Sequence, residues 1–318
     1  MAKCRAMLFD AMFLLLGIAL LYLGGEALVD GATAIARRLG LSTLVIGLTI
    51  VAFGTSAPEL AATMTATSEG APDLGLGNVI GSNIANIGLI LGVSAILLPL
   101  RTTTRFILRE LPFMGGCSLL LLPILRDDVI SRVEGLGLIG LLTAYLSFLY
   151  LTSKGEPQPD DEDMPSAAKA LLFVTLGSCL LVGGAKALVF GGTGLAEGLG
   201  VPQRVIGLSV IAIGTSLPEL ASSLAAARKG DSDMILGNVV GSNVFNVLCI
   251  LGITSTAIPM SVDGSEVQAD LLVMLGLSLA VPLLLWKGRR LARLEGLGLL
   301  VLWSLYIASL ARQLPTSG

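Results

Sequence analysis

Ten apolar segments follow one another along this sequence of 318 residues. A membrane-spanning helix needs about 20 mostly apolar residues, and the segments cover 8–36, 41–68, 73–100, 106–125, 133–152, 168–197, 203–227, 233–260, 267–286 and 294–311. Charged residues make up 14% of the chain, against roughly 25% in a soluble domain, and the mean hydropathy is +0.86. The segments do not alternate between apolar and polar residues, as the strands of a barrel would. We therefore predict an all-α membrane protein with ten transmembrane helices, surrounded by the lipid bilayer.

The composition argues against several functional classes. The chain has no histidine, which removes histidine-based metal sites, catalytic triads and proton relays. No nucleophile–base pair and no aspartate dyad lies deep in the apolar segments, so an enzyme is not expected, and neither is a prosthetic group. Most charges lie in short loops, so no surface is predicted to bind nucleic acid. The cysteines show no pairing or metal spacing, and we interpret them as small packing residues.

A polar, acidic stretch divides the chain in two. It contains Asp160, Asp161, Glu162 and Asp163, and such charge runs are usually solvated linkers. The predicted organisation is one five-helix domain over 1–152, a linker over 153–167 and a second five-helix domain over 168–318.

The distribution of basic residues predicts the orientation of the chain. Lys and Arg number 6 on the N-terminal side of the ten spans and 12 on the other side, leaving out Lys169 and Lys186 inside the sixth span. The positive-inside rule then puts both termini outside the cell or in the periplasm, and the linker in the cytoplasm. The expected location is the plasma (inner) membrane of a prokaryote.

The two halves repeat each other. Residues 52–61 match 212–221 at 8 of 10 positions, and 77–86 match 237–246 at 7 of 10, so both matches share one offset. Because five helices is an odd number, the second copy starts on the opposite side of the membrane. The copies are therefore predicted to be inverted, an architecture typical of secondary transporters with the substrate at the midplane between the repeats.

Each repeat places a glutamate beside a proline in an uncharged span. The motif Gly-Thr-Ser-x-Pro-Glu occupies 54–59 and 214–219. Proline interrupts a helix, and in lipid an opened backbone is tolerated only in a cavity or inside protein. A carboxylate at membrane depth costs at least about 2.5–3.5 kcal/mol, and a hard cation held between Glu59 and Glu219 would offset that cost. Calcium takes 6–8 oxygen ligands, and the motif adds freed carbonyls and the hydroxyls of Thr55, Ser56, Thr215 and Ser216.

A second repeated motif, Gly-Asn-Val-x-Gly-Ser-Asn, occupies 77–83 and 237–243. One helical turn separates the members of two pairs, Ser82 with Asn86 and Ser242 with Asn246, so each pair shares a face that can add oxygens to the cation site. The glycines of the motif leave room for a neighbouring helix, and small-residue faces can also serve helix packing alone. Charges elsewhere in the spans are not predicted at the site, because Lys186 aligns with Glu26 and supplies no matching acid.

These motifs resemble those of the cation/calcium exchanger superfamily and, within it, the prokaryotic sodium/calcium exchangers. The resemblance implies an antiporter in which inward sodium flow drives calcium outward by alternating access, with the long first and sixth helices sliding over the core. It implies that Glu59 and Glu219 hold calcium with the carbonyls of Thr55 and Thr215. It also implies that Asn86 and Asn246 border this centre. Flanking sodium sites are implied at Ser56, Ser82, Ser216 and Ser242 and the carbonyls near Ala52 and Ala212.

The sequence departs from that family pattern at one point. Related exchangers carry an acidic residue at the position of Asn86 or Asn246, whereas both are amides here, which argues against potassium cotransport. Two alternatives stay open: a proton/calcium antiporter that uses protonation of Glu59 and Glu219, and a cation channel. We expect the protein to function as a monomer.

Overall fold

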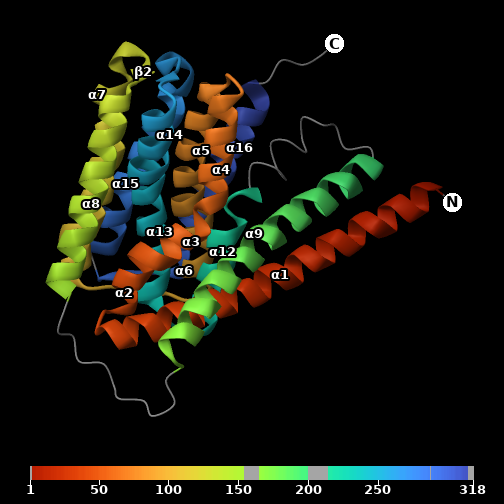
Figure 1. The fold of residues 1–318 in the computed structure, drawn as a ribbon, viewed down its shortest axis with the longest axis horizontal. Coiled ribbons are helices and arrows are strands. Elements are labelled where there is room, and N and C mark those ends of the chain that lie inside the picture. The colour runs from red at the N-terminus through yellow and green to blue at the C-terminus, as the bar shows by residue number, and fades with distance from the viewer. Residues whose placement is uncertain (1, 154–164, 200–213, 287, 314–318) are drawn as a thin grey trace.

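The computed structural model shows a bundle of helices (Figure 1). It describes residues 2–153, 165–199, 214–286 and 288–313. Within these residues, eight helices are long and apolar enough to cross a membrane, and the bent pair Thr43–Thr55 and Ala57–Ser68 makes a ninth span if it is counted as one. These spans coincide with nine of the ten predicted segments. The remaining segment, 203–227, lies partly outside the described residues, and its described end forms a helix.

The elements of the two halves follow the same order, and those from α4 to α8, apart from one 3₁₀ turn, recur at equivalent places in the second half. The first half contains α1 (Ala2–Leu39), α2 (Thr43–Ile46), the π-helical turn η1 (Gly47–Val51), α3 (Ala52–Thr55), α4 (Ala57–Ser68), α5 (Pro72–Ala85), the π-helical turn η2 (Asn86–Leu91), α6 (Gly92–Leu97), β1 (Leu100–Arg101), α7 (Thr104–Ile124), the 3₁₀ turn η3 (Leu125–Asp127), β2 (Val129–Ile130) and α8 (Arg132–Ser153). The second half contains α9 (Ala167–Gly198), α12 (Leu217–Arg228), α13 (Ser232–Phe245), the π-helical turn η5 (Asn246–Ile250), α14 (Leu251–Ala257), β3 (Met260–Ser261), α15 (Gly264–Trp286), β4 (Arg290–Leu291) and α16 (Arg293–Gln313). Of the predicted linker 153–167, residues 154–164 lie outside the described residues.

Two predicted spans, 73–100 and 233–260, were too long at their C-terminal ends. The helices end three residues earlier, before Leu98 (φ −129°) and Ile258 (φ −135°), whose backbones are extended. Each of these residues precedes a proline, and proline disfavours the helical conformation at the residue before it.

Short strands join the helix ends in two antiparallel pairs. β1 pairs with β4, and β2 pairs with β3. Because β1 precedes α7 and β2 follows it, the two pairs lie at opposite ends of that helix. β3 is the counterpart of β1, so equivalent connections of the two halves lie at opposite ends of the bundle. These strands lie outside the predicted spans and were not predicted from the sequence.

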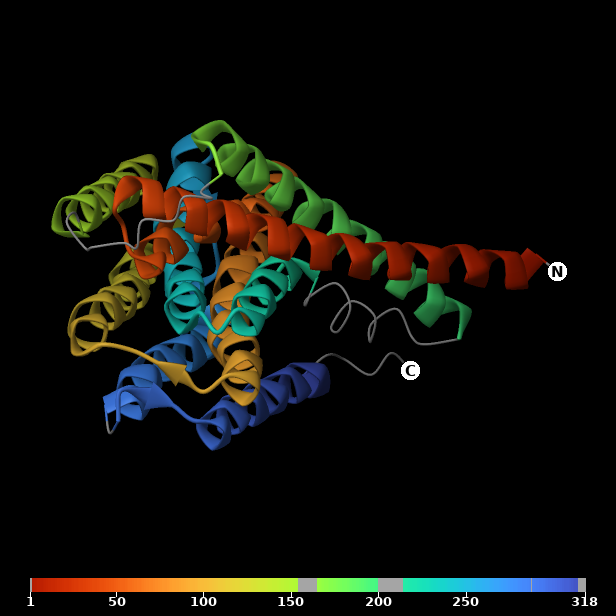
Figure 2. The same ribbon diagram turned by 90° about the horizontal axis from the view of Figure 1, so that it is seen from below.

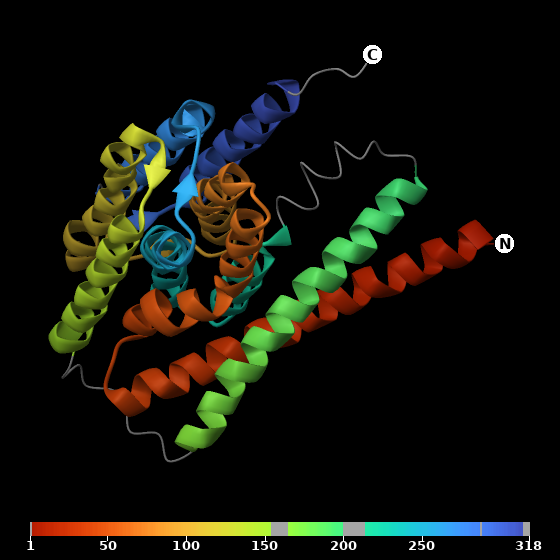
Figure 3. The same cartoon turned by 45° about the horizontal axis from the view of Figure 1, so that its top comes forward.

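The two longest helices, α1 and α9, cross side by side on one face of the bundle (Figures 2 and 3). Glycines spaced seven residues apart line their contact: Gly17, Gly24 and Gly31 on α1, and Gly177, Gly184 and Gly191 on α9. A Cβ atom at Gly24 would lie 2.8 Å from the main-chain nitrogen of Leu181, and one at Gly177 would lie 2.5 Å from that of Leu28. Glycine allows this approach because it has no side chain, so the two helices form one closely packed, antiparallel unit.

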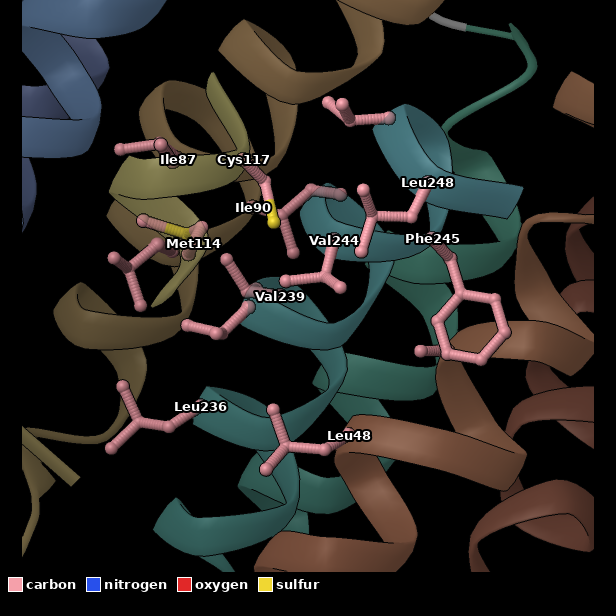
Figure 4. Close-up of a cluster of buried hydrophobic side chains, with 14 of the residues drawn as sticks. Leu48, Ile87, Ile90, Met114, Cys117, Leu236, Val239, Val244, Phe245 and Leu248 are labelled. Carbon is pink, nitrogen blue, oxygen red and sulfur yellow. The ribbon is translucent and has the colours of Figure 1, made fainter. Parts of the chain in front are cut away.

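The core of the bundle surrounds α13. The segment Ser232–Ala257 is apolar enough to span a membrane, and its most apolar stretch is buried entirely inside the protein. Figure 4 shows Leu236, Val239 and Val244 of α13 packed among side chains of η1, η2 and α7. The polar residues of this segment therefore face protein and not lipid. The packing role predicted for the cysteines fits Cys117 and Cys249, which are buried, and is wrong for Cys179, which is exposed.

Candidate cation site

The two motif glutamates lie just inside the starts of two helices. α3 ends at Thr55, the backbone turns at Ser56 (φ −82°, ψ 7°) and α4 begins with Ala57 and a proline. The axis bends by 45° across this break, which the proline predicted because it cannot donate a main-chain hydrogen bond. In the second half Ser216 has nearly the same conformation (φ −86°, ψ 4°) before α12. Glu59 and Glu219 therefore occupy first turns, where the helix dipole favours an anion.

The tertiary structure brings the two motifs together. Ser56 Oγ donates a hydrogen bond of 3.2 Å to Glu219 Oε1, across 163 residues of sequence. Thr55 Oγ1 donates one of 3.4 Å to Asn238 Oδ1 of α13. Glu59 and Glu219 are each only 1% exposed. Two carboxylates thus share one buried region between the halves.

Asparagines complete this region with a reciprocal pair of hydrogen bonds. Asn86 Nδ2 donates to Asn243 Oδ1 at 3.0 Å, and Asn246 Nδ2 donates to Asn83 Oδ1 at the same distance. Because these bonds hold the nitrogens of Asn86 and Asn246, their Oδ1 atoms point elsewhere. Both Oδ1 atoms are buried and have no hydrogen-bond partner among the described residues. The bonding pattern leaves two amide oxygens available as ligands.

Six buried oxygens from predicted ligands have no hydrogen-bond partner within the described part of the chain. They are Glu59 Oε2, Glu219 Oε2, Asn86 Oδ1, Asn246 Oδ1, Ser216 Oγ and Ser242 Oγ. An unpaired buried polar group costs about 1–3 kcal/mol, and more when it is charged. Carboxylate, amide and hydroxyl oxygens are the ligands of hard cations such as calcium. The chemistry of this set fits a divalent cation, whose charge would balance the two carboxylates.

The other predicted ligands differ in burial and in whether their polar groups already make hydrogen bonds. Ser82 is buried on α5, and Thr215 is half-buried beside Glu219. The hydroxyl of Thr55 also donates to the carbonyl of Val51 at 3.1 Å. The carbonyl of Ala52 accepts from the Ser56 main-chain N–H at 3.0 Å, so it is already part of a helical turn. Ala212 lies outside the described residues.

Two asparagines that were not predicted as site residues hold the interrupted helices. Asn78 Nδ2 donates to the main-chain oxygen of Glu59 at 3.2 Å, and Asn238 Nδ2 donates to that of Glu219 at 3.3 Å. Asn83 and Asn243 were likewise not predicted as residues that orient other amides. The available signal was that each recurs at the equivalent position of the other repeat, inside a span whose only charged residue is the aspartate at its start.

The glycines of the second motif were predicted to admit a neighbouring helix, and in the second half they do. A Cβ atom at Gly237 would lie 2.5 Å from the carbonyl oxygen of Leu44, and one at Gly241 would lie 2.7 Å from Leu48. By the repeat, the neighbours of Gly77 and Gly81 would be residues 204–208, which lie outside the described residues.

A cavity of about 1260 Å³ lies between α4 and α9. Pro58, Gly214 and Thr215 line its inner part, next to the glutamates. Its lining also includes Met7 and Glu69, near the N-terminus of α1 and the end of α4. The cavity therefore extends from residues of the two glutamate motifs to the end of the bundle that carries the N-terminus.

The chain is similar to proteins of a known family along almost its whole length. The profile of the family described as sodium/calcium exchanger protein matches residues 9–151 and again residues 169–311. The putative antiporter CaxA of Alkalimonas amylolytica is 39% identical over 308 residues, which cover 93% of this chain and 96% of the relative. The sodium/calcium exchanger MaX1 of Methanosarcina acetivorans is 33% identical, with 94% and 97% covered. A solved structure of the sodium-calcium exchanger NCX_Mj, soaked with Na⁺ and Sr²⁺, superposes with a TM-score of 0.82 at 34% identity, over 95% of this chain and 99% of that one.

Proposed function

Since the chain belongs to the sodium/calcium exchanger family, we propose that it is an antiporter that exchanges sodium for calcium across the plasma membrane of a prokaryotic cell. In this proposal inward sodium flow drives calcium out of the cell. The functional unit is one chain, because both carboxylates of the site come from it.

The observation that carries the proposal is the convergence of Glu59 and Glu219 with unpartnered neutral oxygens. Two carboxylates supply a charge of −2, which a single calcium ion balances. The amide oxygens of Asn86 and Asn246 raise the number of ligands without adding charge. We assign these four side chains to calcium, together with the main-chain carbonyls of Thr55 and Thr215.

Sodium binds to smaller sets of the same oxygen ligands. We assign the flanking sodium sites to Ser56, Ser82, Ser216 and Ser242, with the carbonyls near Ala52 and Ala212. The hydrogen bond from Ser56 to Glu219 supports sites that share a ligand. Sodium at Ser56 and calcium between the glutamates would then compete for the carboxylate of Glu219. Competition of this kind is what an exchanger needs, since the two ions must not be carried together.

The transport cycle follows from ten helices arranged as two inverted five-helix repeats. The pairing of β1 with β4 and of β2 with β3 supports inversion, because equivalent connections then lie on opposite membrane faces. The unit of α1 and α9 slides over the remaining helices and exposes the site to one face at a time. The glycine contact supports movement as one body, since the two backbones touch along its length.

The distribution of basic residues supports an orientation with both termini outside. The cavity between α4 and α9 then faces outward and leads to the glutamates. Ions from outside would reach Glu59 and Glu219 through it, while the opposite side of the site is closed.

Calcium uptake into proteoliposomes tests the proposal. Vesicles loaded with sodium and diluted into sodium-free buffer should take up ⁴⁵Ca²⁺, whereas an imposed pH gradient without sodium should not drive uptake. Uptake driven by the pH gradient and indifferent to sodium would identify a proton/calcium antiporter instead. Single-channel currents in planar bilayers would contradict any exchanger.

A further inference from the structure

An ion-pair cluster joins the end of α12 to α1, the two helices that the repeat relates to α4 and α9. Lys229, at the end of α12, lies 3.3 Å from Glu26 and 2.6 Å from Asp30, both on α1. Arg228 adds a second contact of 3.4 Å to Glu26. The helices also touch beside these charges, because a Cβ atom at Gly25 would lie 2.8 Å from the carbonyl oxygen of Ala221.

The repeat places two charges of opposite sign at the equivalent positions on the open side. In the alignment of the two halves, Lys186 on α9 is the counterpart of Glu26, and Glu69 at the end of α4 is the counterpart of Lys229. The acid and the base have therefore exchanged places between the halves. Both side chains line the cavity between α4 and α9, and within the described residues neither takes part in an ion pair or a hydrogen bond.

The backbone positions beside these charges correspond in the same way. The counterparts of Gly25 and Ala221 are Ala185 and Ala61, and both line the cavity. One half thus shows a closed contact between two helices, and the other half shows the same contact opened.

We propose that Lys186 and Glu69 form the outer gate of the ion path: they pair when the cavity closes, as the pair of Glu26 and Lys229 opens on the inner side. This proposal rests on the exchange function proposed above. Each pair joins one glutamate and one lysine, so the reach of the two side chains is the same on both sides. The methyl group of Ala185 requires a slightly wider helix contact than Gly25 does, and the long lysine chain spans that difference.

The two gates differ in strength. Asp30 and Arg228, which strengthen the inner pair, correspond to Phe190 and Ser68 on the outer side, so the outer pair has no second acid or base at these positions. A partly exposed ion pair shifts an equilibrium by at most about fivefold, so it keeps a gate closed but still able to open. The additional inner contacts favour the conformation in which the cavity opens at the N-terminal end, as observed.

Cross-linking tests the gate directly. On a background without the four native cysteines, Glu69→Cys/Lys186→Cys and Glu26→Cys/Lys229→Cys are treated in proteoliposomes with a bifunctional methanethiosulfonate reagent long enough to replace the two side chains. We expect each pair to cross-link, each cross-link to stop calcium flux, and reduction to restore it. The ionic condition, sodium or calcium, that speeds one cross-link should slow the other. Failure of the outer pair to cross-link in any condition, or equal responses of both pairs, would overturn the proposal.

Charge reversal gives an independent measurement. Lys186→Glu or Glu69→Lys alone puts like charges at the outer gate and should slow exchange by up to about fivefold, the effect of a partly exposed ion pair. The double variant Lys186→Glu/Glu69→Lys recreates the orientation of the inner pair and should recover the rate. Additive losses in the double variant would refute the pairing. Sodium-driven calcium uptake by the cysteine-free parent tests the exchange function separately, so that either idea can fail alone.

Discussion

Asn243 is predicted to set calcium affinity without touching the ion. Its Oδ1 accepts the hydrogen bond from Asn86 Nδ2 at 3.0 Å, which leaves the carbonyl oxygen of Asn86 available as a ligand. In Asn243→Ala that acceptor is gone, and the Asn86 amide can turn its nitrogen toward the site. An amide nitrogen cannot ligate a cation, so part of the population loses one ligand.

The magnitude follows from the hydrogen bond that orients Asn86. The other bond lost in Asn243→Ala, from Asn243 Nδ2 to Met114 Sδ at 3.5 Å, does not act on the Asn86 amide. A buried hydrogen bond contributes about 0.5–1.5 kcal/mol net, and 1.4 kcal/mol is a factor of ten in binding. The calcium concentration for half-maximal uptake should therefore rise about 2- to 12-fold. Asn83→Ala should give the same increase, because Asn83 accepts from Asn246 at the same distance.

The assay is ⁴⁵Ca²⁺ uptake into sodium-loaded proteoliposomes over a range of calcium concentrations. Ser94→Ala is the matched control, since Ser94 is a buried residue of α6 whose hydroxyl has no hydrogen-bond partner among the described residues. Thermal unfolding of the purified proteins checks that each variant is folded. An unchanged calcium affinity in Asn243→Ala, or a change no larger than that in Ser94→Ala, would refute the orienting role.

Three further predictions concern the site and the helix contact. Glu59→Gln or Glu219→Gln should abolish calcium transport in a folded protein, because one carboxylate cannot balance a divalent ion; near-normal uptake in both would remove them from the site. Ser82→Ala should raise the sodium concentration for half-maximal exchange more than the calcium concentration, and an unchanged sodium titration would contradict its assignment. Gly24→Val should lower the midpoint of thermal unfolding, since its Cβ would lie 2.8 Å from the backbone of α9 and overpacking costs about 1–3 kcal/mol. Gly183→Val is the control, because no described atom lies within 4 Å of a Cβ atom there, and equal losses would exclude a special role for the contact.

The sequence predicted the spans well because hydropathy is a local property. A run of about 20 apolar residues has few alternatives to a membrane helix. The internal repeat can be recognised from sequence identity alone. Proline was a reliable sign of the break before Glu59, since its effect acts within one turn. Proline also explains why two predicted spans were too long, because Leu98 and Ile258 leave the helical conformation directly before a proline.

The arrangement of ligands could not be predicted from the sequence in the same way. Asn86 and Asn246 each begin a π-helical turn, and the sequence contains no signal for such a turn, which often marks functional positions. The partners that orient them, Asn243 and Asn83, lie 157 and 163 residues away along the chain. Contacts of this range depend on how whole helices pack, which helical periodicity does not determine.

By itself, the sequence determined that this chain is a membrane protein of repeated halves with a buried glutamate in each. These conclusions rest on composition, on segment length and on the internal repeat. The tertiary structure alone decided which oxygens lack partners among the described residues, which asparagines orient others, and that Lys186 lines a cavity whereas Glu26 is ion-paired. The physical reason is that a single helix specifies its own turns and faces, whereas the partner of a buried oxygen and the gap between two helices depend on packing between segments far apart in the chain.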